Sequence, residues 1–237
     1  GGQKPGFYWN RFPVSTHWFT QAEMSTPPVF RQCTQKSCRF RYPEAAGQSD
    51  STACPRCGHP TQIVLLPHIP RDPNPRQPTV PGPQVEALLD NIRSAFNVGS
   101  MFRTADGAGL RHLHLCGLTP PPTHPRVSKT ALGAETIVEW SIYPNAVDCA
   151  RKLKSNGMRI WALEVSEGSV SLPEITGELA GSPIVLVVGS EVAGVDPGIL
   201  EMCDRKIWIP MVGFKRTLNV AIAFGITAYW LRFGGWT

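Results

Sequence analysis

The sequence predicts an α/β domain built on a largely parallel sheet, preceded by a small cysteine-rich segment. From residue 85 onward, short apolar runs alternate with segments of helical length and pattern, which is typical of an α/β domain. One run, residues 183–189, is continuous and rich in Val, as in a strand buried on both faces of a parallel sheet. Four cysteines in two close pairs predict the small segment.

The expected elements follow from these runs and from the residues that end them. Asn97 is expected to cap a helix over 98–108, and Gly109 to end it, because Asn and Gly favour these two positions. Further helices are expected over 144–156, 197–203 and 218–233. Strands are expected over 85–90, 111–116, 137–143, 158–165, 183–189 and 206–210.

Prolines divide the chain of 237 residues, a length that allows a small domain beside a medium one. Seven prolines fall within the 17 residues 67–83, and such a stretch favours a stiff, extended linker. We therefore expect an N-terminal arm over 1–29, a cysteine-rich segment over 30–66, a linker over 67–84 and a larger domain over 85–237. The second proline cluster, 120–125, is expected to be a loop within that domain.

The first residues allow two interpretations. Either Met24 is the natural start and the residues before it are an upstream extension, or residues 1–23 form a mobile aromatic arm. No secretory signal is visible, and no apolar run reaches the roughly 18–20 residues of a membrane helix. The sequence therefore predicts a soluble, cytoplasmic protein.

The net charge of +5 is unevenly distributed. Residues 1–84 hold 9 Lys and Arg against 4 Asp and Glu, whereas residues 85–237 hold 14 of each. A basic first third indicates either a solvated lead-in or an arm that binds a polyanion.

Four of the seven cysteines have spacing suited to a metal. Cys33 and Cys38 form a C-x4-C pair, Cys54 and Cys57 form a C-x2-C pair, and 15 residues separate the pairs. Two such pairs can converge on one zinc ion, which would stabilise a segment too small to fold on its apolar content. His59 could replace a cysteine. Two disulfides are the alternative, disfavoured by the lack of a secretory signal.

Cations and aromatic residues alternate around these cysteines. This mixture suits RNA, since cations neutralise phosphates and aromatic rings stack on bases; alternatively, the rings only pack a small core. The residues are Arg31, Lys36, Arg39, Arg41 and Arg56 with Phe30, Phe40 and Tyr42.

Several common catalytic signatures are absent from the sequence. There is no G-x-x-x-x-G-K-[ST], no G-x-G-x-x-G after a strand, no G-x-S-x-G and no H-E-x-x-H. Their absence argues against P-loop phosphate chemistry and the simplest dinucleotide site.

Three segments, 91–109, 187–200 and 209–225, each follow an expected strand end. Gly189 ends the Val-rich run, where a backbone without a side chain can approach a ligand closely. Arg103 suits a phosphate or ribose oxygen, and Asn219 offers both a donor and an acceptor. Taken singly, each has a plainer interpretation as a turn glycine, a helix cap or an ion pair between Arg103 and Asp106.

The three segments read NIRSAFNVGSMFRTADGAG, VVGSEVAGVDPGIL and IPMVGFKRTLNVAIAFG. Together and in order, they closely resemble the three motifs of the SpoU/TrmH family of RNA 2′-O-ribose methyltransferases, within the SPOUT superfamily. The resemblance covers roughly residues 85–233. It implies an α/β fold with a C-terminal trefoil knot that holds a bent S-adenosylmethionine. It also implies a homodimer in which the knot region forms the interface.

The resemblance further implies roles for individual residues. Cofactor contacts would come mainly from backbone around Gly189, Ile209, Met211 and Leu218. Arg103 matches the family arginine that is assigned to activating the ribose 2′-hydroxyl. Because an arginine stays protonated in proteins, we expect this residue to stabilise the developing alkoxide. The supporting polar residues would be Asn97, Glu191, Thr217 and Asn219.

Two positions depart from the family pattern. Thr217 stands where Ser is common, and its hydroxyl can make the same bond; Val192 stands where Gly is frequent. We therefore expect an enzyme acting on tRNA or rRNA. The alternatives are a non-catalytic RNA-binding or ribosome-assembly factor of the same fold, and a knotted enzyme that methylates a base.

Overall fold

The computed structural model describes residues 29–44, 52–65, 82–175, 179, 181 and 183–234. The chain divides into two compact units, residues 1–76 and 77–237, which are described separately. The expected arm over 1–29 lies outside the described residues except for Val29, and most of the expected linker over 67–84 lies outside them too.

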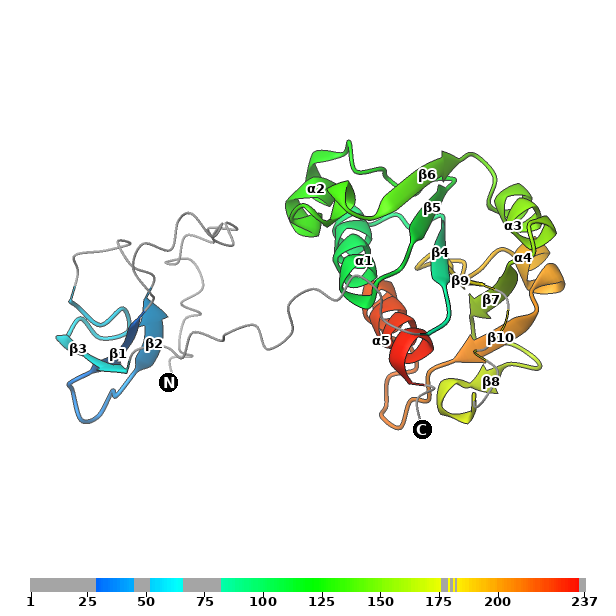
Figure 1. Cartoon of the computed structure of the whole chain (residues 1–237). Helices are drawn as coiled ribbons and strands as arrows, with labels where there is room; N and C mark the ends of the chain where they lie inside the picture. The colour runs from blue at the N-terminus through cyan, green and yellow to red at the C-terminus, as the bar shows by residue number, and fades with distance from the viewer. Residues whose placement is uncertain are drawn as a thin grey trace. The chain divides into compact units, whose positions relative to one another are not determined.

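The first unit contains a three-stranded antiparallel sheet (Figure 1). Its strands are β1 (Val29–Cys33), β2 (Arg41–Glu44) and β3 (Thr61–Leu65), in the order β2-β1-β3. Cys33 is the last residue of β1, Cys38 lies between β1 and β2, and Cys54 and Cys57 lie between β2 and β3.

The second unit is an α/β domain with a seven-stranded parallel sheet, which confirms the predicted fold class (Figure 1). Every strand pair in it is parallel, and the order is β6-β5-β4-β9-β7-β10-β8. The strands are β4 (Val85–Asp90), β5 (His112–Cys116), β6 (Glu139–Tyr143), β7 (Arg159–Leu163), β8 (Val170–Ser171), β9 (Ile184–Val188) and β10 (Arg205–Trp208).

Helices cover both faces of this sheet (Figure 1). One apolar core joins the sheet to α1 (Ala95–Ala108), α2 (Pro125–Ala131) and α5 (Val220–Phe233). A second core joins the opposite face to α3 (Ala146–Ser155) and α4 (Pro197–Met202). Two 3-10 turns complete the elements, η3 (Ala134–Thr136) and η4 (Leu172–Glu174).

The Val-rich run forms the strand that lies between these two cores. All five residues of β9 are buried. Its alternate residues enter opposite cores, for example Val187 on one face and Val188 on the other. A strand that is covered on both faces needs apolar side chains at every position, which is why this run shows no alternation of polar and apolar residues.

Two local expectations were wrong. The first helix of the second unit begins at Ala95, with Ser94 as its N-cap: the Ser94 hydroxyl accepts a hydrogen bond from the Asn97 N–H at 3.3 Å. Asn97 therefore lies within the first turn and its side chain is left for other contacts. The proline cluster 120–125 is not only a loop, because Pro125 is the first residue of α2, where its fixed φ angle suits a helix start.

Among the described residues, no helix is both long and apolar enough to cross a membrane. The expected cytoplasmic location stays a prediction.

Candidate functional site

The loop after β9 folds back tightly on the end of its strand. Ser190 and Gly194 exchange two backbone hydrogen bonds of 3.0 and 2.9 Å. A side chain at Gly189 would meet backbone atoms of Gly194 and Val195 at 2.1–2.2 Å. Gly189 is therefore required because its own turn approaches closely, which the sequence could not distinguish from close approach of a ligand. The folded turn carries Glu191.

Side chains from three distant segments meet around Glu191. The Asn97 side-chain amide donates to Glu191 Oε1 at 3.0 Å, and the Arg93 N–H donates to Oε2 at 3.2 Å. The Asn219 amide in turn donates to Asn97 Oδ1 at 3.2 Å. We call Asn97, Glu191 and Asn219 the polar triad. It joins the three segments that the sequence singled out.

Asn219 has a structural role as well. Its Oδ1 accepts a hydrogen bond from the Ala221 N–H at 2.9 Å and so caps α5. The cap interpretation does not exclude the site interpretation, because one amide has both a donor and an acceptor. The cap fixes the orientation in which the Asn219 amide group faces Asn97.

Hydrogen-bond donors around Glu191 favour the ionised form of its carboxyl. Partial burial would raise the pKa of this carboxyl, but the backbone N–H groups of Glu191 and Arg93, together with the Asn97 amide, outweigh burial and lower the pKa below its ordinary value. Glu191 is thus a fixed negative charge at neutral pH.

A pocket of about 580 Å³ lies beside the triad, at the carboxyl ends of β9, β7 and β10. Ligands bind at this edge in open parallel sheets. Seven of the expected site residues line the pocket: Gly189, Glu191, Ile209, Met211, Thr217, Leu218 and Asn219.

Two expected residues do not line this pocket. Asn97 reaches it only through its bonds to Glu191 and Asn219. Arg103 is exposed on α1 and lies outside the lining. Within the described part of the chain, no ion pair joins Arg103 to Asp106, so the plainer interpretation of this arginine is not observed.

Sequence reasoning did not single out several further pocket residues, among them Glu164, Trp208 and Arg216. Glu164 follows β7 directly, and Trp208 is the last residue of β10. A position at the carboxyl end of a parallel strand was the available signal. This signal was weak, because the sequence alone does not fix the residue at which each strand ends.

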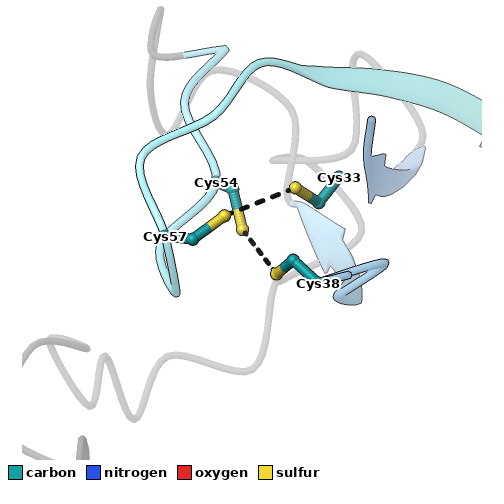
Figure 2. Close-up of side chains that lie close together, drawn as sticks. All are labelled: Cys33, Cys38, Cys54 and Cys57. Atoms are coloured by element: carbon teal, nitrogen blue, oxygen red, sulfur yellow. Dashed lines mark hydrogen bonds between the residues drawn. The ribbon is translucent and has the colours of Figure 1, made fainter. Parts of the chain in front are cut away.

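The four cysteines of the first unit converge, as Figure 2 shows. Cys33 Sγ lies 3.5 Å from Cys57 Sγ, and Cys38 Sγ lies 3.9 Å from Cys54 Sγ. All four sulfur atoms lie within 4.8 Å of one another, and all are free thiols. Four sulfurs held about 2.3 Å from one zinc ion would be about 3.8 Å apart. The donor set and its spacing therefore fit zinc.

The two cysteine turns have matching backbones. The Cys33 N–H donates to Phe40 O at 2.8 Å, and the Cys54 N–H donates to His59 O at 2.7 Å. The residue after the second cysteine of each pair is left-handed, Arg39 with φ +46° and Gly58 with φ +76°. His59 is exposed and is not one of the four converging ligands.

The cations of the first unit are mostly exposed. Arg31 differs, because its Nε donates to the Glu44 carboxylate in a largely buried ion pair. Aromatic rings lie among the cations: Arg41 lies over the Phe30 ring at 5.9 Å, and Phe40 stacks on Tyr42 at 5.7 Å. The exposed cations are Lys36, Arg39, Arg41 and Arg56.

Comparison with known proteins matches residues 84–229 to the SpoU rRNA Methylase family. The chain belongs to this family. Two relatives are a 23S rRNA (guanosine(2553)-2′-O)-methyltransferase of Bacillus subtilis and a tRNA (guanosine(18)-2′-O)-methyltransferase of Aquifex aeolicus. The first is 30% identical over 178 residues, which are 73% of this chain. The second is 34% identical over 142 residues, which are 60% of this chain. This SpoU chain spans 65% of the length of each of them.

Solved structures agree with this family membership. An AdoMet-bound rRNA methyltransferase from Sinorhizobium meliloti matches with a TM-score of 0.59 and 28% identity, over 64% of this chain and 57% of that one. The TrmH/SpoU tRNA modifying enzyme of Aquifex aeolicus matches with a TM-score of 0.56 and 31% identity, over 63% of this chain and 74% of that one.

Proposed function

We propose that this protein is an S-adenosylmethionine-dependent methyltransferase that acts on a ribose 2′-hydroxyl of tRNA or rRNA. The observation that carries the proposal is the pocket at the sheet edge, lined by Glu191 and Asn219 of the polar triad, in a chain of the SpoU family. The two curated relatives support both target classes, since one is named for 23S rRNA and the other for tRNA.

The pocket suits S-adenosylmethionine in size and in chemistry. Its volume of about 580 Å³ falls in the usual range for a small-molecule site. Apolar residues Ile209, Met211 and Leu218 would border the ligand, and Gly189 would leave backbone groups accessible. The Sinorhizobium meliloti structure was solved with AdoMet bound. When bound, this cofactor supplies a methyl group on a sulfonium.

The polar residues would bind and orient the RNA ribose. Glu191, ionised and held by Asn97, would fix the triad so that the Asn219 amide keeps its position beside the pocket. The Thr217 hydroxyl lines the same wall and would hydrogen-bond the ribose or its phosphate. A triad held in this way favours a single orientation of the acceptor hydroxyl.

Arg103 would stabilise the alkoxide that develops as the 2′-hydroxyl loses its proton, and would hold the neighbouring phosphate. A guanidinium is a donor-only group that suits an oxyanion and a phosphate. Because Arg103 lies outside the pocket of its own chain, we infer that it acts on the site of a second copy.

That inference leads to a homodimer. Along α5, Ile222, Ile226, Tyr229 and Phe233 recur on one side, with between 39% and 56% of each residue exposed. On the neighbouring α1, Phe96 is 52% exposed. Arg103 follows Phe96 by seven residues, which is two helical turns and therefore the same side. A second copy on this apolar face would bring its Arg103 into the interface.

The resemblance also leads us to propose a trefoil knot. Its support is the course of the chain after β10, which lies beyond β7 in the sheet order. From there the chain returns to form α5, which packs against α1. Residues 209–219 make this return, and six of them line the pocket together with Gly189 and Ser190 after β9.

We further propose that the first unit is a zinc ribbon that contacts RNA. The four thiol groups have the geometry for zinc, and Lys36, Arg39, Arg41 and Arg56 are exposed around them. In this proposal, residues 30–66 form the ribbon, 67–84 the linker and 85–237 the methyltransferase domain.

The test is methyl transfer from labelled S-adenosylmethionine to purified tRNA and rRNA. Wild type should label RNA. Arg103→Ala should lose at least about a hundredfold in rate while it still binds the cofactor. Arg151→Ala, on α3 against the opposite face of the sheet, is the matched control and should retain full activity. Wild-type binding of RNA without any labelling would favour the non-catalytic alternative.

A further inference from the structure

Glu164 is an acidic residue of the pocket that none of the three motifs contains. It follows β7 directly, and its backbone N–H donates to Ile207 O of β10 at 2.9 Å. Since β7 lies between β9 and β10 in the sheet, this residue is anchored where three strands end. It lines the same pocket as Gly189 and Leu218.

Its carboxylate is held in one orientation by two backbone N–H groups. Glu164 Oε1 accepts from Val165 at 3.1 Å, and Oε2 accepts from Val195 at 3.0 Å. Gly194 makes room for it: a Cβ there would lie 2.5 Å from Glu164 Oε2. The turn after β9 is thus shaped to admit this side chain.

Each oxygen keeps an acceptor position after these bonds. A carboxylate has about four lone-pair sites, of which the two N–H groups use two. The other acid of the pocket, Glu191, is already engaged by Asn97 and Arg93. Glu164 therefore offers two adjacent acceptors that a pocket ligand can fill.

The chemistry that matches is a pair of neighbouring hydroxyl groups. A vicinal diol gives one O–H donor to each carboxylate oxygen. Acidic side chains at the carboxyl edge of parallel sheets hold nucleotide riboses in this way. Hydrogen bonds to an ionised acceptor are also the strong ones.

We propose that Glu164 binds the 2′- and 3′-hydroxyls of the adenosyl ribose of the cofactor and selects ligands that carry both. The proposal rests on the proposed function, because it takes the pocket to hold S-adenosylmethionine. It adds a cofactor-binding residue at β7, outside the three motifs.

The test is a thermodynamic cycle in which the Glu164 side chain and the ligand hydroxyls are removed singly and together. Calorimetry on the full chain measures the dissociation constant of each combination. The ligands are S-adenosylhomocysteine and its 2′-deoxy and 3′-deoxy analogues. For wild type, removal of either hydroxyl should weaken binding at least about tenfold. For Glu164→Gln, which keeps the size and one acceptor oxygen, the same removal should cost less than about threefold.

Glu167→Gln is the matched control. Glu167 is exposed on the turn after β7 and does not line the pocket, so this variant should behave as wild type with all three ligands. A merely structural role of Glu164 would weaken all three ligands by the same factor in Glu164→Gln.

Three results would overturn the proposal. The first is an equal penalty for hydroxyl removal in wild type and Glu164→Gln. The second is a Glu164→Gln variant that binds S-adenosylhomocysteine more weakly than wild type but binds 5′-methylthioadenosine equally well. Because 5′-methylthioadenosine lacks the amino group, this result would assign Glu164 to the ammonium. In both cases the adenosyl ligand still binds wild type, and the proposed function stands. Failure of wild type to bind any adenosyl ligand would remove both.

Discussion

At the scale of single residues, the site is a small set of polar groups that orient one another through hydrogen bonds. Glu191 is the clearest example, because N–H groups from two segments lower its pKa. Asn97 and Asn219 each use both ends of an amide. A change at any one of the three therefore alters the other two.

The contribution of Glu191 to the stability of the fold should therefore depend on pH. A carboxyl whose pKa is lower in the folded state than in the unfolded state, where it is about 4.3, stabilises the fold at pH values above about 4.3. This stabilisation is lost as the pH falls through the pKa of the folded state. Glu191→Gln should therefore be less stable than wild type at pH 7, and the difference should shrink as the pH falls below about 4. Denaturant unfolding at both pH values measures it.

The control for this prediction is Glu167→Gln, an exposed glutamate with no bond to the triad. It should leave stability unchanged across the same range. A stability difference for Glu191→Gln that is as large in acid as at pH 7 would show that the triad does not depend on the charge.

A motif in the sequence can fix both the type of a residue and its place in the chain. Gly189, Glu191 and Asn219 were singled out in this way, and the structure brings them to one pocket. Glu164 and Trp208 belong to no motif, and what places them at the pocket is the pairing of β7, β9 and β10. Such pairing depends on contacts distant in sequence, which a local pattern does not contain.

At the scale of elements, two helical glycines lie in opposite environments. Gly99 faces α2 so closely that a Cβ would meet Thr130 Oγ1 at 1.9 Å and the Val127 carbonyl oxygen at 2.5 Å. A Cβ added at Gly225 in α5 would instead meet the Thr104 side chain at 3.8 Å, which is ordinary van der Waals contact. The first glycine permits close helix packing, whereas the second only lowers helix propensity.

Opposite effects on stability should follow. Gly99→Ala should destabilise the second unit by at least about 2 kcal/mol, because a backbone carbonyl must move. Gly225→Ala should stabilise it by about 0.5–1 kcal/mol. Equilibrium unfolding in urea measures both, and a neutral Gly99→Ala would refute the packing of α1 on α2.

Element boundaries show why local prediction was incomplete. Ser94 and Asn97 are both good caps, and the structure uses Ser94, one turn earlier. Pro125 was assigned to a loop, yet it starts α2. In both cases the residue preference was correct, and tertiary packing chose among the positions that the preference allowed.

At the scale of the whole molecule, the two units are expected to depend on different sources of stability. The second unit has two apolar cores, whereas the first has a three-stranded sheet and four converging thiols. A chelator should therefore unfold residues 29–65 and leave 82–234 folded. Amide exchange on the full chain measures this, and unchanged protection of 29–65 after metal removal would refute the zinc proposal.

The proposed homodimer leads to a separate prediction. Ile226→Glu places a charge in the exposed apolar face of α5 and should convert the dimer to monomer. It should also abolish methyl transfer, because Arg103 is proposed to act across the interface. Leu118→Glu, at a residue that is 71% exposed on the turn after β5, should leave the dimer intact. Sedimentation analysis decides, and a wild-type monomer at working concentration would contradict the proposal.

In the proposed function, the pocket and the triad direct a methyl group to a ribose oxygen. The most direct measurement is alkaline hydrolysis of RNA labelled by the purified protein with methyl-labelled S-adenosylmethionine. A 2′-O-methyl group blocks cleavage at its own 3′ phosphate, so the label should appear in alkali-resistant dinucleotides. Label recovered entirely in mononucleotides would place the methyl group on a base and contradict the claim.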